Sequence, residues 1–198
     1  MLDLPPKNFA PKGLPCVTVD AAILFRISRY GSGEPYFGCS LSNRFDSPSE
    51  IPEERFKTCY TALSLEAAFA ETVLHDEELI DGNFFIAETA LTSRYVIHFA
   101  GAPLKIANLT GAALKTLGGN GALSTIKPYD LPQAWSRAIY KHQDQVDGFQ
   151  YVSRHCNTHL AVVLFERARK KLTKLRYTPL AKYPGLEDIV REFAVQFI

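Results

Sequence analysis

The chain interleaves short strand-type runs with short helical segments, and this irregular order constrains its fold more than any other feature. No internal repeat is present, so repeat architectures are excluded. Intermingled strands and helices predict an α+β fold whose central sheet is mixed or largely antiparallel and is flanked by helices. Hydrophobic periodicity and turn residues predict strands at residues 22–28, 56–62, 84–91, 94–99, 104–109, 149–153, 160–166 and 173–179, and helices at 64–75, 110–118, 130–145 and 186–197.

The length of the chain indicates one domain with short extensions. It has 198 residues, of which 46% are hydrophobic and 22% charged, an ordinary composition for a chain that buries a core. Residues 1–20 are rich in proline and are expected to form an extended arm. Residues 21–170 then form the main domain, and a strand and a helix in residues 171–198 pack on the same domain.

Charge and hydropathy exclude several kinds of partner. The formal net charge is +1, from 22 basic and 21 acidic residues, so nucleic acid is not an expected partner. No apolar run approaches the roughly 18–20 residues that span a bilayer, and the N-terminus has no signal-peptide pattern. We therefore expect a cytoplasmic protein without a membrane partner. Its cysteines are then expected to be reduced thiols: Cys16, Cys39, Cys59 and Cys156.

Glu71 is an unusual residue for its position in the sequence. The helix expected around residues 65–74 reads LEAAFAETVL and is apolar on most sides, which is typical of a buried helix. An ionised carboxylate between two packed faces needs partners. From the helix alone, a salt-bridged or edge-exposed glutamate is the more frequent case, and a functional carboxylate is the alternative.

Three other side chains are candidates for a ligand pocket. Tyr60 lies toward the end of the strand before that helix, where a phenol can stack on a flat ring or simply belong to the core. Arg44 lies between irregular segments and suits a phosphate or carboxylate, or else pairs with Asp46 on the surface. Arg26 interrupts an apolar strand, so it must find an anion or a carbonyl, in support of either structure or a ligand.

The segment after the strand at 149–153 supplies the last candidates. Ser153 lacks the Gly-x-Ser-x-Gly elbow of a hydrolase nucleophile, so a hydroxyl that positions a ligand is the better interpretation. His155, Cys156 and His159 form a short His-Cys-x-x-His run, but no fourth zinc ligand is apparent nearby, and no metal site is expected.

The order of these motifs resembles the RES domain, a family named for its arginine, glutamate and serine. The likeness extends from about residue 22 to 168, and the strand tyrosine is followed by a helical glutamate eleven positions later (71 − 60). The N-terminal arm and the polar segment 46–55 are longer than in compact members. The motifs in chain order are Phe25-Arg26-Ile27-Ser28, Asn43-Arg44-Phe45-Asp46, Cys59-Tyr60-Thr61-Ala62, Ala68-Phe69-Ala70-Glu71, Trp135, Asp147-Gly148-Phe149-Gln150-Tyr151-Val152-Ser153-Arg154 and Ala161-Val162-Val163-Leu164-Phe165.

This resemblance implies a fold similar to that of ADP-ribosyltransferases and a toxin whose partner is an Xre-type helix-turn-helix antitoxin. It also implies depletion of NAD+, by hydrolysis or phosphorolysis, with NAD+ as the substrate and no separate cofactor. The family's named positions correspond to Arg44, Glu71 and Ser153. Tyr60 matches the family's pocket tyrosine, and Arg26 matches an arginine often present on the first strand.

The chemistry is compatible with one carboxylate. Cleavage of the nicotinamide–ribose bond passes through an oxocarbenium-like state, and nicotinamide leaves as a neutral molecule, so no general acid is needed. We expect Glu71 to stabilise the ribosyl cation, Arg44 and Arg26 to hold the diphosphate, Tyr60 to pack on nicotinamide and Ser153 to bond the substrate. Protein mono-ADP-ribosylation is an alternative, and so is a catalytically silent module that binds a nucleotide or an antitoxin.

Overall fold

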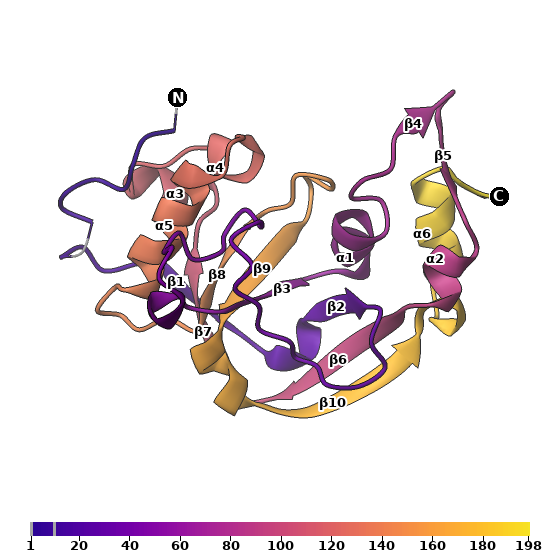
Figure 1. Cartoon of the computed structure of the whole chain (residues 1–198), viewed down its shortest axis with the longest axis horizontal. Helices are drawn as coiled ribbons and strands as arrows, with labels where there is room; N and C mark the ends of the chain where they lie inside the picture. Colours follow the sequence, from indigo (N-terminus) through magenta and orange to yellow (C-terminus); the bar gives the residue numbers. More distant parts are fainter. Residues whose placement is uncertain (1, 10) are drawn as a thin grey trace.

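Within residues 2–9 and 11–198, which the computed structural model describes, eight strands form one curved mixed sheet (Figure 1). The strand order is β1-β7-β8-β9-β3-β2-β6-β10, and every neighbouring pair is antiparallel except β7 with β8. The bounds are β1 Cys16–Val19, β2 Phe25–Ser28, β3 Thr58–Ala62, β6 Tyr95–Gly101, β7 Leu104–Asn108, β8 Gly148–Val152, β9 Leu160–Phe165 and β10 Leu172–Pro179.

A second, three-stranded sheet lies at one end of the molecule (Figure 1). Its order is β11-β5-β4, in which β11 (Val195–Phe197) runs parallel to β5 (Asn83–Ile86) and β4 (Leu79–Ile80) runs antiparallel to it. The C-terminal strand thus pairs with a segment more than a hundred residues earlier in the chain, which ties the tail to the domain.

The helices gather at the two ends of the large sheet (Figure 1). One group consists of α3 (Gly111–Thr116), α4 (Ala122–Thr125) and α5 (Asp130–Tyr140), and α5 contacts β8. The other group consists of α1 (Leu65–Thr72), α2 (Thr89–Thr92) and α6 (Leu186–Glu192), and α1 contacts β2 and β3. This arrangement of helices around a mixed sheet confirms the predicted α+β fold class.

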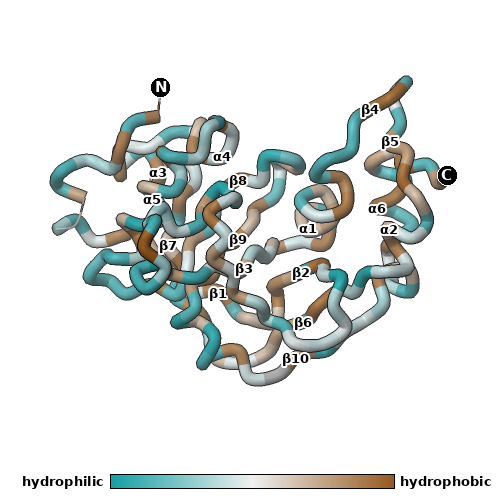
Figure 2. The backbone as a smooth tube through the Cα atoms, in the orientation of Figure 1, coloured by the Kyte–Doolittle hydropathy of each residue, from teal (hydrophilic) through white to brown (hydrophobic). Residues whose placement is uncertain are grey.

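Burial follows the pattern that the strands predict. Five consecutive residues of β9, from Ala161 to Phe165, are buried, as expected for a central strand covered on both faces. Trp135 of α5 and Phe149 of β8 belong to one core, and Phe69 of α1 belongs to a second core. Figure 2 shows the apolar tip at β4 outside these cores, where Leu79 and Ile80 are exposed.

The expected N-terminal arm is attached to this scaffold at several points. The ring of Phe9 meets that of Trp135 edge to face at 5.5 Å, and the indole Nε1 of Trp135 donates to the carbonyl of Asp3 at 2.8 Å. The end of the arm is itself a strand, β1, which pairs with β7 at the edge of the sheet. These contacts make the arm part of the packed structure.

Three of the predicted elements are shorter in the structure than the sequence predicts. The strand predicted from residue 22 begins instead with a 3₁₀ helix, Ala21–Ile23, because the carboxylate of Asp20 accepts from the Ala22 amide at 2.9 Å. The helix expected at 64–75 ends at Thr72. The helix expected at 130–145 ends at Tyr140, one residue before its C-cap, Lys141.

Two other predictions are wrong about the type of structure. The strand predicted at 84–91 ends at Ile86, and Thr89–Thr92 form helix α2, where the hydroxyl of Ser93 donates back to the Thr89 carbonyl. The helix predicted at 186–197 ends at Glu192, because Ala194 has a φ of 50° and turns the chain into β11. Apolar periodicity revealed neither change: α2 is a short helix held by local hydrogen bonds, and β11 depends on pairing with the distant strand β5.

Candidate functional site

A cavity of about 530 Å³ opens where α1 faces the ends of β2 and β3 and the loop at residues 42–44. Four of the five side chains singled out in the sequence line it: Arg26, Arg44, Tyr60 and Glu71. Ser153 lies behind Glu71, buried at 1% exposure. The structure thus brings all five predicted residues together, although they span 127 positions of the chain (153 − 26).

Glu71 is placed by the local structure of α1. The helix starts close to the end of β3 because Ser64 caps it, accepting from the Ala67 amide at 3.1 Å. Apolar neighbours such as Phe69 hold α1 against the sheet, and Glu71 is left half-buried at the cavity. Glu71 therefore lies at the boundary between the core and the cavity.

Hydrogen bonds fix one oxygen of this carboxylate. The hydroxyl of Ser153 donates to Oε1 of Glu71 at 2.6 Å, and the backbone amide of Arg154 donates to the same oxygen at 3.2 Å. The described residues donate no hydrogen bond to Oε2. Glu71 thus presents one oriented oxygen atom without a hydrogen-bond donor.

Ser153 is fully occupied by these protein contacts. Besides donating to Glu71, its hydroxyl accepts from the backbone amide of Cys156 at 3.0 Å. The sequence suggested that this hydroxyl bonds the substrate. In this structure the hydroxyl hydrogen-bonds Glu71, and Ser153 is not among the residues that line the cavity.

Tyr60 connects β3 to the loop that carries Arg44. Its ring lines the cavity, while its hydroxyl accepts from the Phe45 amide at 3.0 Å and lies 3.3 Å from Oδ1 of Asp46, to which it donates. Burial, together with the charge of Asp46, raises the pKa of Tyr60 well above its ordinary value. The phenol therefore stays protonated. Its ring forms part of the cavity wall, and its hydroxyl holds the loop at Phe45 and Asp46 in place.

Arg44 is held over an aromatic ring. Its guanidinium carbon lies 4.6 Å from the centre of the Tyr129 ring, and one guanidinium nitrogen donates to the carbonyl of Ile126 at 2.6 Å. Burial lowers the pKa of Arg44, and the nearby charge of Arg154 lowers it further. The remaining donors of the fork suit an anion.

The alternative pairing of Arg44 with Asp46 is not seen among the described residues. Asp46 is 1% exposed, and its carboxylate accepts instead from neutral donors that surround it. They are the hydroxyls of Ser40, Thr58 and Tyr60 and the backbone and side-chain amides of Asn43. Asp46 thereby fixes the loop and leaves Arg44 without a carboxylate partner.

Arg26 lines the cavity, but its guanidinium group already binds groups of the protein. Its Nε lies 2.9 Å from Oε2 of Glu34, and another guanidinium nitrogen donates to the Tyr60 carbonyl at 2.8 Å. Burial raises the pKa of Glu34, but the charge of Arg26 and hydrogen bonds to the carboxylate outweigh it, so that the pKa is lowered overall. Arg26 thus supports the strand that carries Tyr60.

Sequence reasoning missed several residues of the cavity wall. Arg154 follows Ser153 directly, and its charge acts on Arg44 and His155. His75 lies four positions after Glu71, a helical spacing that could have indicated a shared face. Tyr151 is buried beside Glu71, and burial raises its pKa.

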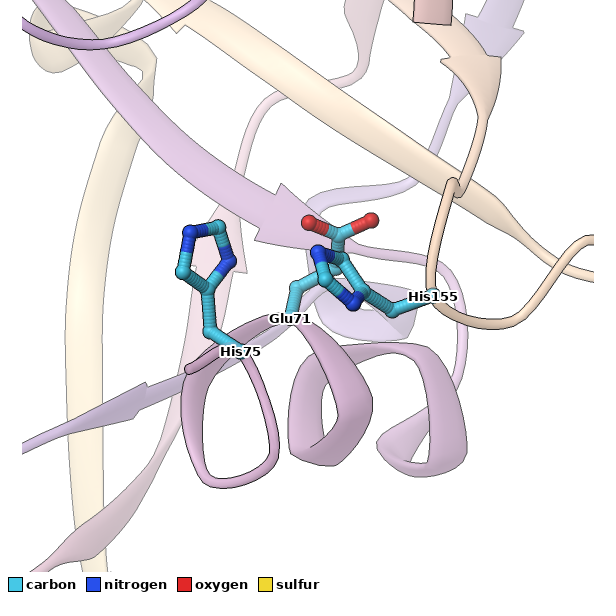
Figure 3. A group of neighbouring side chains, drawn as sticks. All are labelled: Glu71, His75 and His155. Atoms are coloured by element: carbon cyan, nitrogen blue, oxygen red, sulfur yellow. The ribbon is translucent and has the colours of Figure 1, made fainter. Parts of the chain in front are cut away.

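The His-Cys-x-x-His run is divided in the structure. Cys156 and His159 face each other, with Sγ 3.1 Å from Nδ1. His155 instead lies beside Glu71 and His75 (Figure 3). Burial lowers the pKa of His155, as do the charges of Arg154 and His75, while the charge of Glu71 opposes them.

The arrangement defines what the site can do chemically. One oriented carboxylate stands near two guanidinium groups, Arg44 and Arg154, and beside the aromatic rings of Tyr60 and Tyr129. Such a site suits a ligand that carries a flat ring, an anionic group and a centre where positive charge develops.

Comparison with known proteins identifies the family and the fold of the chain. A family model described as the RES domain matches residues 23–184, so the chain belongs to the RES domain family, as its motif order predicted. The fold is shared with a crystal structure of the M. tuberculosis MbcT–MbcA toxin–antitoxin complex: the TM-score is 0.61 at 14% sequence identity, over 92% of this chain and 96% of that chain. No curated protein sequence matches the chain.

Among the described residues, no helix has both the length and the apolar character needed to cross a bilayer.

Proposed function

We propose that this protein cleaves the nicotinamide–ribose bond of NAD+. The observation that carries the proposal is the 2.6 Å hydrogen bond from Ser153 to Oε1 of Glu71, at the wall of a cavity of about 530 Å³. Ser153, which is 1% exposed, orients the Glu71 carboxylate at the wall of a cavity where a ligand can sit. This is the geometry needed to stabilise a cation that forms on the substrate.

The substrate would be held by the groups around that carboxylate. Arg44, fixed by the Tyr129 ring and the Ile126 carbonyl, offers its planar fork to the diphosphate, and Arg154 adds a second positive charge. The Tyr60 ring packs on nicotinamide. Binding at both ends places the scissile bond beside Glu71.

In the reaction, Oε2 of Glu71 faces the ribose as the bond to nicotinamide lengthens. Positive charge moves from the nicotinamide ring to the ribose carbon, and the carboxylate stabilises it there. Nicotinamide leaves as a neutral molecule, taking the bonding electron pair. Water, phosphate or a protein side chain then adds to the ribose carbon and gives up its proton.

The experiment measures nicotinamide release from NAD+ by the purified protein, with and without phosphate. The wild type is expected to release nicotinamide, and Glu71→Gln to lose at least about a hundredfold in rate, since it removes the charge that acts on the transition state. Glu66→Gln is the matched control, because it makes the same change in α1 at a residue outside the cavity.

Equal release by the wild type and Glu71→Gln would refute the catalytic role. The products identify the acceptor: free ADP-ribose indicates water, and ADP-ribose 1-phosphate indicates phosphate. Label from NAD+ that stays on protein would show mono-ADP-ribosylation instead. No turnover, with NAD+ binding retained, would show a silent binding module.

We further propose that the protein acts as a toxin in the cytoplasm and is neutralised by an Xre-type antitoxin. Family membership supports this, and so does the shared fold with the toxin–antitoxin complex. Expression of the wild type should arrest growth and lower cellular NAD+, whereas Glu71→Ala should do neither. Co-expression of a neighbouring helix-turn-helix protein should restore growth. Arrest by both forms alike would contradict the proposal.

A further inference from the structure

Three side chains that can bind a metal ion meet at the cavity. One ligand atom each from Glu71, His75 and His155 lies within 4.8 Å of the other two (Figure 3). Glu71 is on α1, His75 follows the end of that helix, and His155 comes from the turn after β8. Two segments distant in sequence therefore converge on one point.

The turn at the end of α1 brings His75 near Glu71. The helix ends at Thr72, and the Val73 and Leu74 amides both donate to the Phe69 carbonyl, at 2.7 and 3.3 Å, so the chain leaves the helical path there. Glu71, in the last turn of the helix, and His75, just beyond the helix, both line the cavity. His75 is partly exposed, so an ion in solution can reach it.

His155 has a nitrogen in need of a partner. Its Nε2 is buried, and no group in the described part of the chain hydrogen-bonds to it. Its ring centre lies 4.8 Å from that of His75, with the two planes tilted by 45°. A buried nitrogen of this kind is satisfied by a ligand or a metal ion that sits beside it.

We infer that Glu71, His75 and His155 form a binding site for a divalent transition-metal ion of the zinc class. Two histidines and one glutamate are a donor set that zinc accepts, with a fourth position left open to the cavity. Zinc bonds of about 2.1 Å separate tetrahedral ligand atoms by roughly 3.4 Å. The ligand atoms lie at most 4.8 Å apart, so each pair needs to approach by at most about 1.4 Å (4.8 − 3.4).

The surroundings determine how Glu71 would bind the ion. Ser153 and the Arg154 amide hold Oε1, so Oε2 is the oxygen available to the metal, and the two donors act as outer partners that fix the ligand. Arg44 and Arg154 place positive charge nearby. They weaken the binding, and we expect micromolar affinity, below that of a structural zinc site.

Metal binding has a consequence for activity, and this part rests on the proposed function. An ion on Oε2 of Glu71 takes the oxygen that would face the ribose cation. Zinc is therefore expected to compete with NAD+ for the site and to inhibit nicotinamide release. Added NAD+ should relieve the inhibition.

Calorimetric titration with zinc chloride tests the binding without any substrate. The full-length wild type should bind one equivalent at this site with micromolar affinity. His75→Ala and His155→Ala should each bind at least tenfold more weakly, because each removes one of three ligands. Zinc at a fixed concentration should also raise the melting temperature of the wild type more than that of either variant.

His159→Ala is the matched control, since it removes a histidine of the same turn that faces Cys156 instead. It should bind zinc as the wild type does. The inference is overturned if the wild type binds no zinc, if both cavity variants keep wild-type affinity, or if the loss follows His159. Because no NAD+ is present, these outcomes are independent of whether the protein cleaves it.

Discussion

Replacing Ser153 with alanine tests whether the orientation of Glu71 matters. The substitution removes the 2.6 Å hydrogen bond to Oε1, while the Arg154 amide at 3.2 Å remains. A hydrogen bond to a charged group contributes ~1.5–3 kcal/mol. Each ~1.4 kcal/mol of lost transition-state stabilisation slows a reaction tenfold. Because one donor remains, we expect kcat to fall about 10- to 50-fold.

Steady-state nicotinamide release is the assay, and the division between kcat and KM is informative. A serine that positions Glu71 changes kcat and leaves KM nearly constant. A serine that binds the substrate directly, as the sequence alone suggested, would raise KM instead. Thr158→Ala is the control, because it removes an exposed hydroxyl from the same turn.

The variant also loses the acceptor of the Cys156 amide. An unpaired buried group costs ~1–3 kcal/mol of stability, so activity is measured well below the melting temperature of the variant. If folded Ser153→Ala keeps its kcat within twofold of the wild type, the orientation of the carboxylate by this serine is refuted.

Other predictions concern binding and stability. Arg44→Lys should raise KM for NAD+ about tenfold, because lysine lacks the planar fork; an unchanged KM would contradict its role in binding. Glu34 has a lowered pKa beside Arg26, so their pairing stabilises the fold above the usual value of 4.5 and is lost as the pH falls below it. Acid melting curves of Glu34→Gln should therefore depend less on pH than those of the wild type. Gly148→Ala should cost ~1–3 kcal/mol in denaturant unfolding, since a Cβ would lie 2.1 Å from the Val163 carbonyl oxygen; an unchanged midpoint would refute this.

Local patterns in the sequence were sufficient to predict much of the scaffold. The strand that ends near Tyr60 and the capped helix that carries Glu71 were both expected, because apolar periodicity and the Ser64 cap are local signals. The C-terminal residues were misassigned, since the parallel pairing of β11 with β5 depends on a partner far away in the chain. Where long-range pairing decides the structure, local periodicity is a weaker guide.

The functional site shows the same contrast between what local sequence patterns predict and what only the folded structure reveals. The order of motifs in the sequence predicts which side chains gather at the cavity, but not what each one contacts. That Ser153 bonds Glu71, or that Asp46 turns away from Arg44, follows only from the packed structure. His155 was grouped with Cys156 by proximity in the sequence, whereas the fold turns it toward the cavity.

The bond between Glu71 and Ser153 joins residues 82 positions apart. A chain still being synthesised has made its glutamate long before the serine that orients it, and β9, the strand that pairs with β3, comes later still. The proposed active site can therefore be assembled only after most of the protein has left the ribosome. Fragments that stop before residue 153 contain Glu71 but not the Ser153 hydroxyl that orients its carboxylate. Because β9 must also pair with β3, the proposed activity appears only after the central strands have assembled.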